Sequence, residues 1–244
     1  MLITYCCIFR DEDQKWLQGL IDSIPVNSKI ILMRTEKGLI NDCYKVGTET
    51  IDGNKELTRC EYKYKNWSFG DARNACHQFV ETDWIFMLDS DERVQIDNID
   101  LEYLSKLPKD VGACTVNVVS YFIQDGKPTT SNVAPLTRLY RNNVGVSYKF
   151  RCHEQNRYSI VNAGLKVAET TISVRHRGYE LTKEGRLAKY KRNSELMCLD
   201  IGENVFESED EANYIKFKLF QTLKDELITK GLLTGELNAN NATK

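Results

Sequence analysis

The segment WIFMLDSDE, residues 84–92, most constrains how this chain can fold. It opens with five apolar residues in an unbroken run, which is typical of a strand buried on both faces of a sheet. Asp89, Asp91 and Glu92 follow at once. Ligands of open α/β sheets bind beyond the carboxyl ends of the strands, so we expect these carboxylates to face a ligand crevice.

The amino-terminal residues predict a βαβ unit beside this strand. Residues 2–9 form an apolar, β-branched and aromatic run, and residues 16–24 carry apolar side chains at helical spacing. Residues 29–33 predict a second short buried strand. A strand, a helix and a strand in this order favour a parallel pair.

The remaining elements are predicted from periodicity and turn residues. Residues 34–66 are predicted to be irregular, with one strand near 57–64. The other expected elements are a helix over 70–81 capped by Ser68, a helix over 97–107, a strand over 111–122 that turns at Asp125-Gly126, strand-like stretches over 136–140 and 160–174, and helices over 182–200 and 209–229.

A chain of 244 residues suits one large α/β domain with a small appendage. The amino terminus lacks the pattern of a signal peptide, and no apolar run reaches the roughly 18 residues of a membrane span, so we expect a cytoplasmic protein. Peripheral contact with a membrane stays open. Eight cysteines without CxxC spacing indicate reduced thiols rather than a zinc site.

The net charge of −2 hides a basic middle segment. Lys and Arg number 15 against 21 Asp and Glu in residues 1–137, 13 against 4 in 138–192, and 5 against 10 in 193–244. The middle segment therefore carries +9. It suits an anionic ligand, such as a nucleotide diphosphate, a phosphorylated glycan or nucleic acid, or else forms a solvated basic face.

Four ordered motifs give the carboxylates a context. WSFGDARNACHQFVETDWIFMLDSDE, residues 67–92, is followed by His153-Glu154, by HRGY at residues 176–179 and by KYKRN at residues 189–193. The chain thereby resembles glycosyltransferase family 2, in particular the branch that builds lipopolysaccharide cores.

This resemblance implies the GT-A fold, an α/β fold with a Rossmann-like, mixed and mostly parallel sheet flanked by helices, and a carboxy-terminal helical extension. Residues 1–180 would form the catalytic domain that binds a nucleotide sugar, and residues 181–244 the helical extension packed on it. The implied reaction moves a sugar from a nucleotide-diphosphate sugar, with uridine as the first expectation, to an acceptor hydroxyl with inversion. The implied cofactor is Mn²⁺ or Mg²⁺.

The implied metal ligands are Asp89, Asp91 and His176. Carboxylates at i and i+2 after a strand can each give one oxygen to a divalent cation that bridges phosphate oxygens. Asp91 would bind the metal directly, Asp89 would bind the metal or the donor ribose, and His176 would complete the shell. A buried structural role is the alternative for His176.

The resemblance also implies residues that bind the donor nucleotide. Arg73 matches an arginine that approaches the nucleotide, and its alternative role is a salt bridge on the helix surface. Arg10 and Glu12 match an early Arg-Asn-Glu motif in which this chain has Asp11 instead of asparagine. Arg192 could reach the diphosphate from a closing helix.

Glu154 is the candidate catalytic base, because inverting transfer needs a carboxylate that takes the proton of the acceptor hydroxyl. A salt bridge with Arg151 or Arg157 is its alternative role. His153 is expected to orient Glu154.

One departure from the family leaves the donor base open. The usual Asp-rich turn after the second strand is replaced by MRTEKG at residues 33–38. Two further alternatives stay open: an acceptor that is hydroxymethylated pyrimidine in viral DNA, and a GT-A-like binding protein without catalysis. A sugar-phosphate nucleotidyltransferase is disfavoured, since no glycine-rich loop follows Phe9. The oligomeric state is not predicted.

Overall fold

The computed structural model describes residues 3–124, 127–176 and 183–233. The chain divides into two compact units. The first comprises Met1–Lys149 and Glu154–Glu180, and the second comprises Phe150–His153 and Leu181–Lys244.

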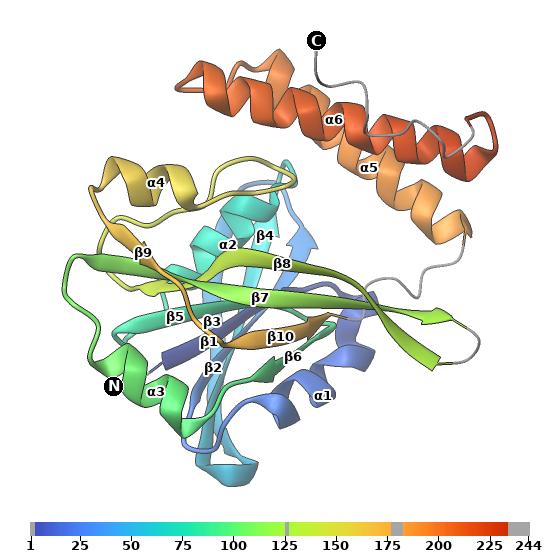
Figure 1. Ribbon diagram of the computed structural model, residues 1–244. Coiled ribbons are helices and arrows are strands. Elements are labelled where there is room, and N and C mark those ends of the chain that lie inside the picture. Colours follow the sequence, from blue (N-terminus) through green and yellow to red (C-terminus); the bar gives the residue numbers. More distant parts are fainter. Residues whose placement is uncertain (1–2, 125–126, 177–182, 234–244) are drawn as a thin grey trace. The chain divides into compact units, whose positions relative to one another are not determined.

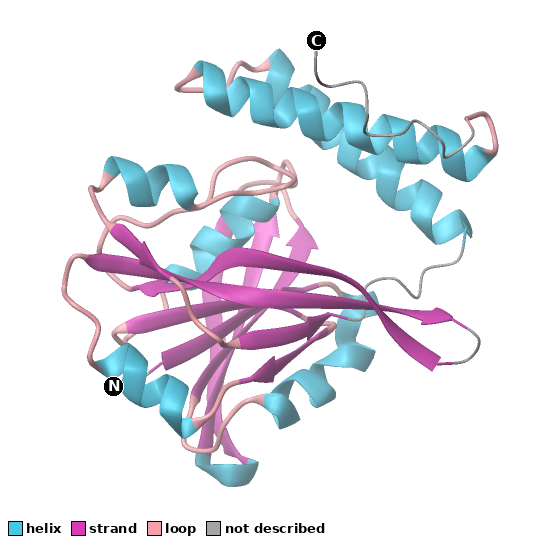
Figure 2. Ribbon diagram, in the orientation of Figure 1, coloured by secondary structure: helices cyan, strands magenta, loops and turns pink. Residues whose placement is uncertain are grey.

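The first unit is built on a sheet with helices on both faces (Figures 1 and 2). Its elements are β1 (Ile3–Phe9), η1 (Asp11–Asp13), α1 (Gln14–Ser23), β2 (Lys29–Lys37), β3 (Asp42–Ile51), η2 (Asp52–Asn54), β4 (Lys55–Tyr64), α2 (Phe69–His77), β5 (Trp84–Asp89), β6 (Glu92–Gln95), α3 (Asn98–Ser105), β7 (Val111–Gln124), β8 (Lys127–Arg141), α4 (Arg157–Asn162), β9 (Lys166–Ala168) and β10 (Ser173–His176).

The sheet is mixed, with a parallel centre. Its strand order is β3-β4-β2-β1-β5-β8-β7-β10-β6, and β9 pairs with β7. β1 lies between β2 and β5 and runs parallel to both. The predicted βαβ unit and the predicted α/β class with a helix-flanked mixed sheet are therefore confirmed.

Every residue of β1 is buried, because both faces of the sheet are covered. Tyr5 and Cys7 belong to a cluster that includes side chains of α1 and α3, whereas Cys6 and Ile8 belong to a second cluster with side chains of α2 and α4. Successive side chains of a strand point to opposite faces, so an unbroken apolar run is what this position requires.

The expectation of an irregular segment over residues 34–66 is wrong in large part. β2 continues to Lys37, and β3 forms an antiparallel pair with β4. β3 lies at the edge of the sheet, and most of its residues are exposed. An edge strand with both faces largely solvated carries no apolar alternation, and periodicity therefore missed it.

Three further expectations differ from the structure. Residues 157–162 form α4, although strand-like material was expected from residue 160. The stretch 136–140 is the end of β8, which begins at Lys127. α2 ends at His77 instead of residue 81. The expected turn at residues 125–126 lies outside the described residues.

The second unit contains two long helices, α5 (Lys183–Gly202) and α6 (Glu209–Lys230), close to their predicted ranges. Ser208 caps α6 by accepting a hydrogen bond from the backbone nitrogen of Glu211, and Gly231 ends it with φ of 74°. No helix among the described residues is long and apolar enough to cross a membrane.

Candidate functional site

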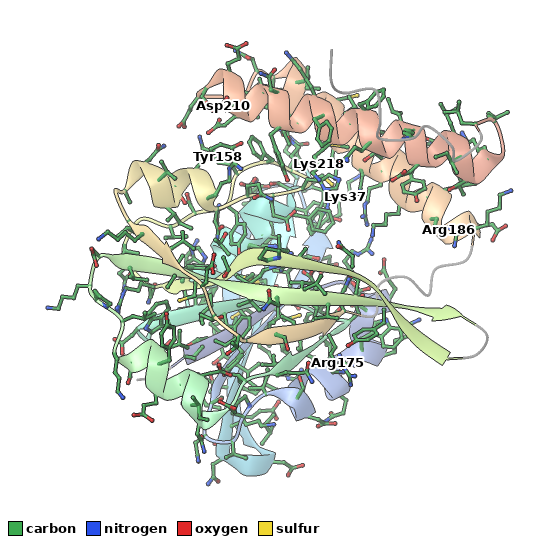
Figure 3. All side chains as sticks on the ribbon, in the orientation of Figure 1. Lys37, Tyr158, Arg175, Arg186, Asp210 and Lys218 are labelled. Atoms are coloured by element: carbon green, nitrogen blue, oxygen red, sulfur yellow. The ribbon has the colours of Figure 1, made fainter. Side chains whose placement is uncertain are left out.

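The candidate site lies at the carboxyl edge of the parallel strands. Asp89 ends β5 at the register of Ile8, so the ends of β1 and β5 lie side by side. β2 ends nearby at Lys37, which Figure 3 labels. Side chains that follow these three strands consequently meet at one edge of the sheet.

Asp89 is held by two arginines. Its Oδ1 accepts a hydrogen bond from Arg73 Nη2 at 2.6 Å, and its Oδ2 accepts one from Arg138 Nη2 at 3.0 Å. Arg73 projects from α2, which Ser68 caps by accepting from the backbone nitrogen of Asp71 at 3.1 Å. The cap and the strand end together place the guanidinium of Arg73 against Asp89.

The two arginines keep Asp89 ionised. Burial opposes the charge of the carboxylate, but the nearby charges of Arg138 and Arg73 outweigh burial and hold the pKa of Asp89 far below its usual value. The side chain of Arg73 is only 4% exposed. Its Nη1 and that of Arg138 are buried and have no hydrogen-bond partner among the residues that the structure describes.

Arg73 also joins Asp89 to the candidate base. Its Nε donates to Glu154 Oε1 at 2.7 Å. Arg151, one of the partners considered for Glu154, instead binds Asp200 at 2.8 Å and Glu203 at 2.6 Å. The salt bridge of Glu154 is therefore made with another predicted site residue.

Asp91 and His176 lie against each other. His176 Nε2 is 3.3 Å from Asp91 Oδ2, and His176 Nδ1 is 3.3 Å from Ser120 Oγ. Burial lowers the pKa of His176, but the hydrogen bond and charge of Asp91 raise it more, so the net shift is upward. Figure 3 labels Arg175, the neighbour of His176 on β10; residues 177–179 of the HRGY motif lie outside the described residues.

This pair fits a metal site in part. A carboxylate oxygen and an imidazole nitrogen at this separation can bind one Mn²⁺, and the contact with Ser120 would orient the ring. Each oxygen of Asp89 accepts one hydrogen bond from an arginine and keeps a further lone pair. No group of three or more His, Cys, Asp or Glu suited to a metal occurs among the described residues. The ligand shell would need oxygens from a bound ligand.

A cavity of about 130 Å³ opens beside Asp89. Its lining residues come from the ends of β1, β2 and β5, from the turn after β1 and from the start of α2 with the segment before it: Ile8, Phe9, Arg10, Asp13, Thr35, Trp67, Phe69, Asp89 and Ser90. The rings of Trp67 and Phe69 contact each other edge to face, with centroids 4.8 Å apart. An aromatic wall beside a few polar groups is typical of a site for a flat ligand.

The other predicted nucleotide contacts lie differently. Arg10 lines the cavity and pairs with Glu12 at 3.0 Å, but Glu12 is outside the lining. Arg192 belongs to the second unit, where its Nε and Nη2 both donate to Asn193 Oδ1.

Sequence reasoning missed Arg138 and the role of Glu92. Arg138 comes from β8, whose pairing with β5 could not be predicted from spacing. Glu92 is 1% exposed, and its Oε2 accepts from the backbone nitrogen of Asp89 at 2.8 Å. Burial, together with the charge of Asp89 and against that of Arg138, raises the pKa of Glu92 to about 7.

Some cations of the basic middle segment bind groups within the fold. Arg138 binds Asp89, Arg141 donates to the backbone carbonyl of Val111, and Arg151 binds Asp200. These cations do not contribute to an open basic face.

No protein-family model matches the chain, and no curated protein matches its sequence. Among solved structures, S. aureus TarS 1–349 in complex with UDP is similar, with a TM-score of 0.46, 9% identity, and coverage of 93% of this chain and 72% of that chain. The same TarS fragment in complex with UDP-GlcNAc gives 0.42, 9%, 93% and 73%. A putative glucose-1-phosphate thymidylyltransferase from Bacillus anthracis gives 0.40, 13%, 73% and 91%. Similarity at this level assigns neither an activity nor a ligand to this chain.

Proposed function

We propose that the chain is a metal-dependent glycosyltransferase of the GT-A type, which moves a sugar from a nucleotide-diphosphate sugar to an acceptor hydroxyl. One observation carries the proposal: Arg73 binds Asp89 and Glu154 at once, at the strand edge where Asp91 meets His176. In this proposal the residues of the separate motifs act together in one site. Residues 1–180 are the proposed catalytic domain.

The donor base occupies the cavity in this proposal. Trp67 and Phe69 provide its aromatic wall, and Asp89 and Ser90 connect it to the carboxylates beyond β5. A nucleotide with its base there would extend its diphosphate along the same edge. A uridine diphosphate sugar is the proposed donor.

Asp91 and His176 would hold Mn²⁺ or Mg²⁺, and the ion would neutralise the charge of the departing diphosphate. Ser120 orients the imidazole of His176. Asp89 acts through the arginines, whose positive charges it keeps at the strand edge.

Glu154 is the proposed base. Arg73 holds its Oε1, and Oε2 takes the proton of the acceptor hydroxyl. The acceptor oxygen bonds to the anomeric carbon as the bond to the diphosphate oxygen breaks, with the electron pair leaving on the diphosphate. Attack opposite the leaving group inverts the configuration.

A glycan is the proposed acceptor, and modified DNA is the alternative. DNA binding depends on cations exposed to phosphates, and Arg138, Arg141 and Arg151 are engaged inside the fold. A binding protein without catalysis is the remaining alternative, which turnover would exclude.

Thermal unfolding with nucleoside diphosphates tests the proposal. UDP at a hundred times its dissociation constant should stabilise the protein by about 2.7 kcal/mol, and Mn²⁺ should increase the effect. Asp91→Ala should remove the Mn²⁺ increment. If no nucleoside diphosphate stabilised the protein with or without Mn²⁺, the proposed function would be wrong.

A further inference from the structure

The polar groups around the cavity differ in how far their hydrogen-bonding atoms are already engaged. Thr35 Oγ1 donates its proton to the backbone oxygen of Phe9 at 3.0 Å, so this hydroxyl can still accept a hydrogen bond but cannot donate another. Both oxygens of Asp89 are bound by arginines. The other carboxylate of the lining is Asp13.

Asp13 keeps one oxygen available. Its Oδ2 accepts from the backbone nitrogen of Arg10 at 3.1 Å and lies 3.6 Å from Arg10 Nε. These two contacts fix the carboxylate, and both leave Oδ1 with its capacity to accept. The side chain is 27% exposed, so a ligand can reach it.

The position of Asp13 follows from the chain after β1. Residues 11–13 form η1, and the carboxylate of Asp13 bonds back to the residue before that turn. This geometry turns Asp13 toward the cavity lining, whereas the neighbouring Glu12 is 62% exposed and outside it. Asp13, the acidic group of the cavity with an oxygen still available, therefore comes from the turn after the first strand and not from the segment after the second.

A ligand of this cavity needs a flat face and an N–H donor. The flat face would lie on Trp67 and the donor would meet Asp13 Oδ1. The cavity volume of about 130 Å³ is small beside the roughly 300–1,000 Å³ of most small-molecule sites. One ring fits such a space better than a fused pair of rings.

We propose that Asp13 reads the base of the donor nucleotide by accepting a hydrogen bond from a ring N–H of a uracil-type pyrimidine. The assignment rests on the proposed function. It names the donor class, a uracil-type nucleoside diphosphate, and a specificity residue at a position other than the Asp-rich turn that this chain lacks.

Asp13→Asn tests the assignment, because an amide can still accept from Arg10 while it offers an N–H to the base. Titration calorimetry with UDP and CDP in Mn²⁺ buffer should show UDP binding weakened by about tenfold and a preference shifted toward CDP. Cytosine presents a bare ring nitrogen where uracil presents an N–H. The matched control is Asp22→Asn on α1, an exposed carboxylate bound to Gln18 at 2.8 Å, which should bind both ligands as the parent does.

The ratio of CDP to UDP affinity does not depend on the folded fraction, so a loss of stability cannot imitate the expected result. An unchanged ratio in Asp13→Asn, with UDP still bound by the parent, would overturn the role of Asp13 and leave the proposed function standing. A parent protein that preferred GDP or ADP to UDP would also overturn the role of Asp13. Failure of the parent to bind any nucleoside diphosphate would instead overturn the proposed function.

Discussion

The charge of Asp89 depends on Arg73 and Arg138, and their charges depend on Asp89 in return. The chain places these groups in a part-buried cluster where an unpaired charge is costly. Two carboxylates, Asp89 and Glu92, would lose a cation if Arg138 were removed.

Arg138→Met should therefore destabilise the fold by about 3–5 kcal/mol, the range found when one partner of a buried ion pair is removed. Urea denaturation measures the loss. Arg59→Met removes an exposed pair with Glu49 and should change stability by less than about 1 kcal/mol. If the two substitutions lowered stability equally, the ion pairs of Arg138 would contribute no more than an exposed pair.

Glu154→Gln should lower the rate of sugar transfer by about 10²–10⁴-fold, because the amide cannot take a proton. It should leave UDP affinity within a few fold of the parent. Transfer assays and calorimetry on the same preparation separate the two effects. A parallel loss of UDP binding would assign Glu154 to the donor site instead.

At the scale of elements, the sequence predicted the strands and helices that have a clear apolar pattern or clear end signals. β5 is an apolar run, and α6 is bounded by Ser208 and Gly231, so each shows in the sequence. β3 is stabilised by pairing with β4 alone along an exposed edge, and α4 is a short helix with only Ile160 buried. Neither carries enough apolar pattern to be recognised.

Ser68 links an element to the site, because its cap starts the helix that carries Arg73. Ser68→Ala should cost about 1 kcal/mol of stability, the usual loss on removing an N-cap. Chemical denaturation measures it. Ser105→Ala removes an exposed hydroxyl that donates to Glu102 and should be close to neutral, so a similar loss there would contradict the capping role.

At the scale of the molecule, α2 and β8 are connected through His77, whose Nε2 lies 2.8 Å from the hydroxyl of Tyr140. Burial lowers the pKa of His77 to about 4. In the unfolded chain the pKa is about 6.5. Between pH 6.5 and pH 4, His77 is therefore protonated in the unfolded state and neutral in the folded state. Stability falls as the pH drops through this range.

Between pH 7 and pH 5 this one group should remove about 2 kcal/mol of stability. His77→Gln should lack that component, so its loss over the same interval should be smaller than the parent's by about that amount. Denaturation curves at the two pH values test the difference. Identical losses in both proteins would show that His77 does not couple protonation to folding.

The sequence by itself determined the central strands, the first βαβ unit, the long carboxy-terminal helices and the carboxylates at a strand end. Each of these depends either on contacts between residues close together in the chain or on burial of one face, which gives the apolar residues a regular spacing. Only the tertiary structure decided that Arg138 binds Asp89, that Arg73 joins Asp89 to Glu154, and that Asp13 lines the cavity. Those relations depend on which strands pair and where loops return, which local periodicity does not encode.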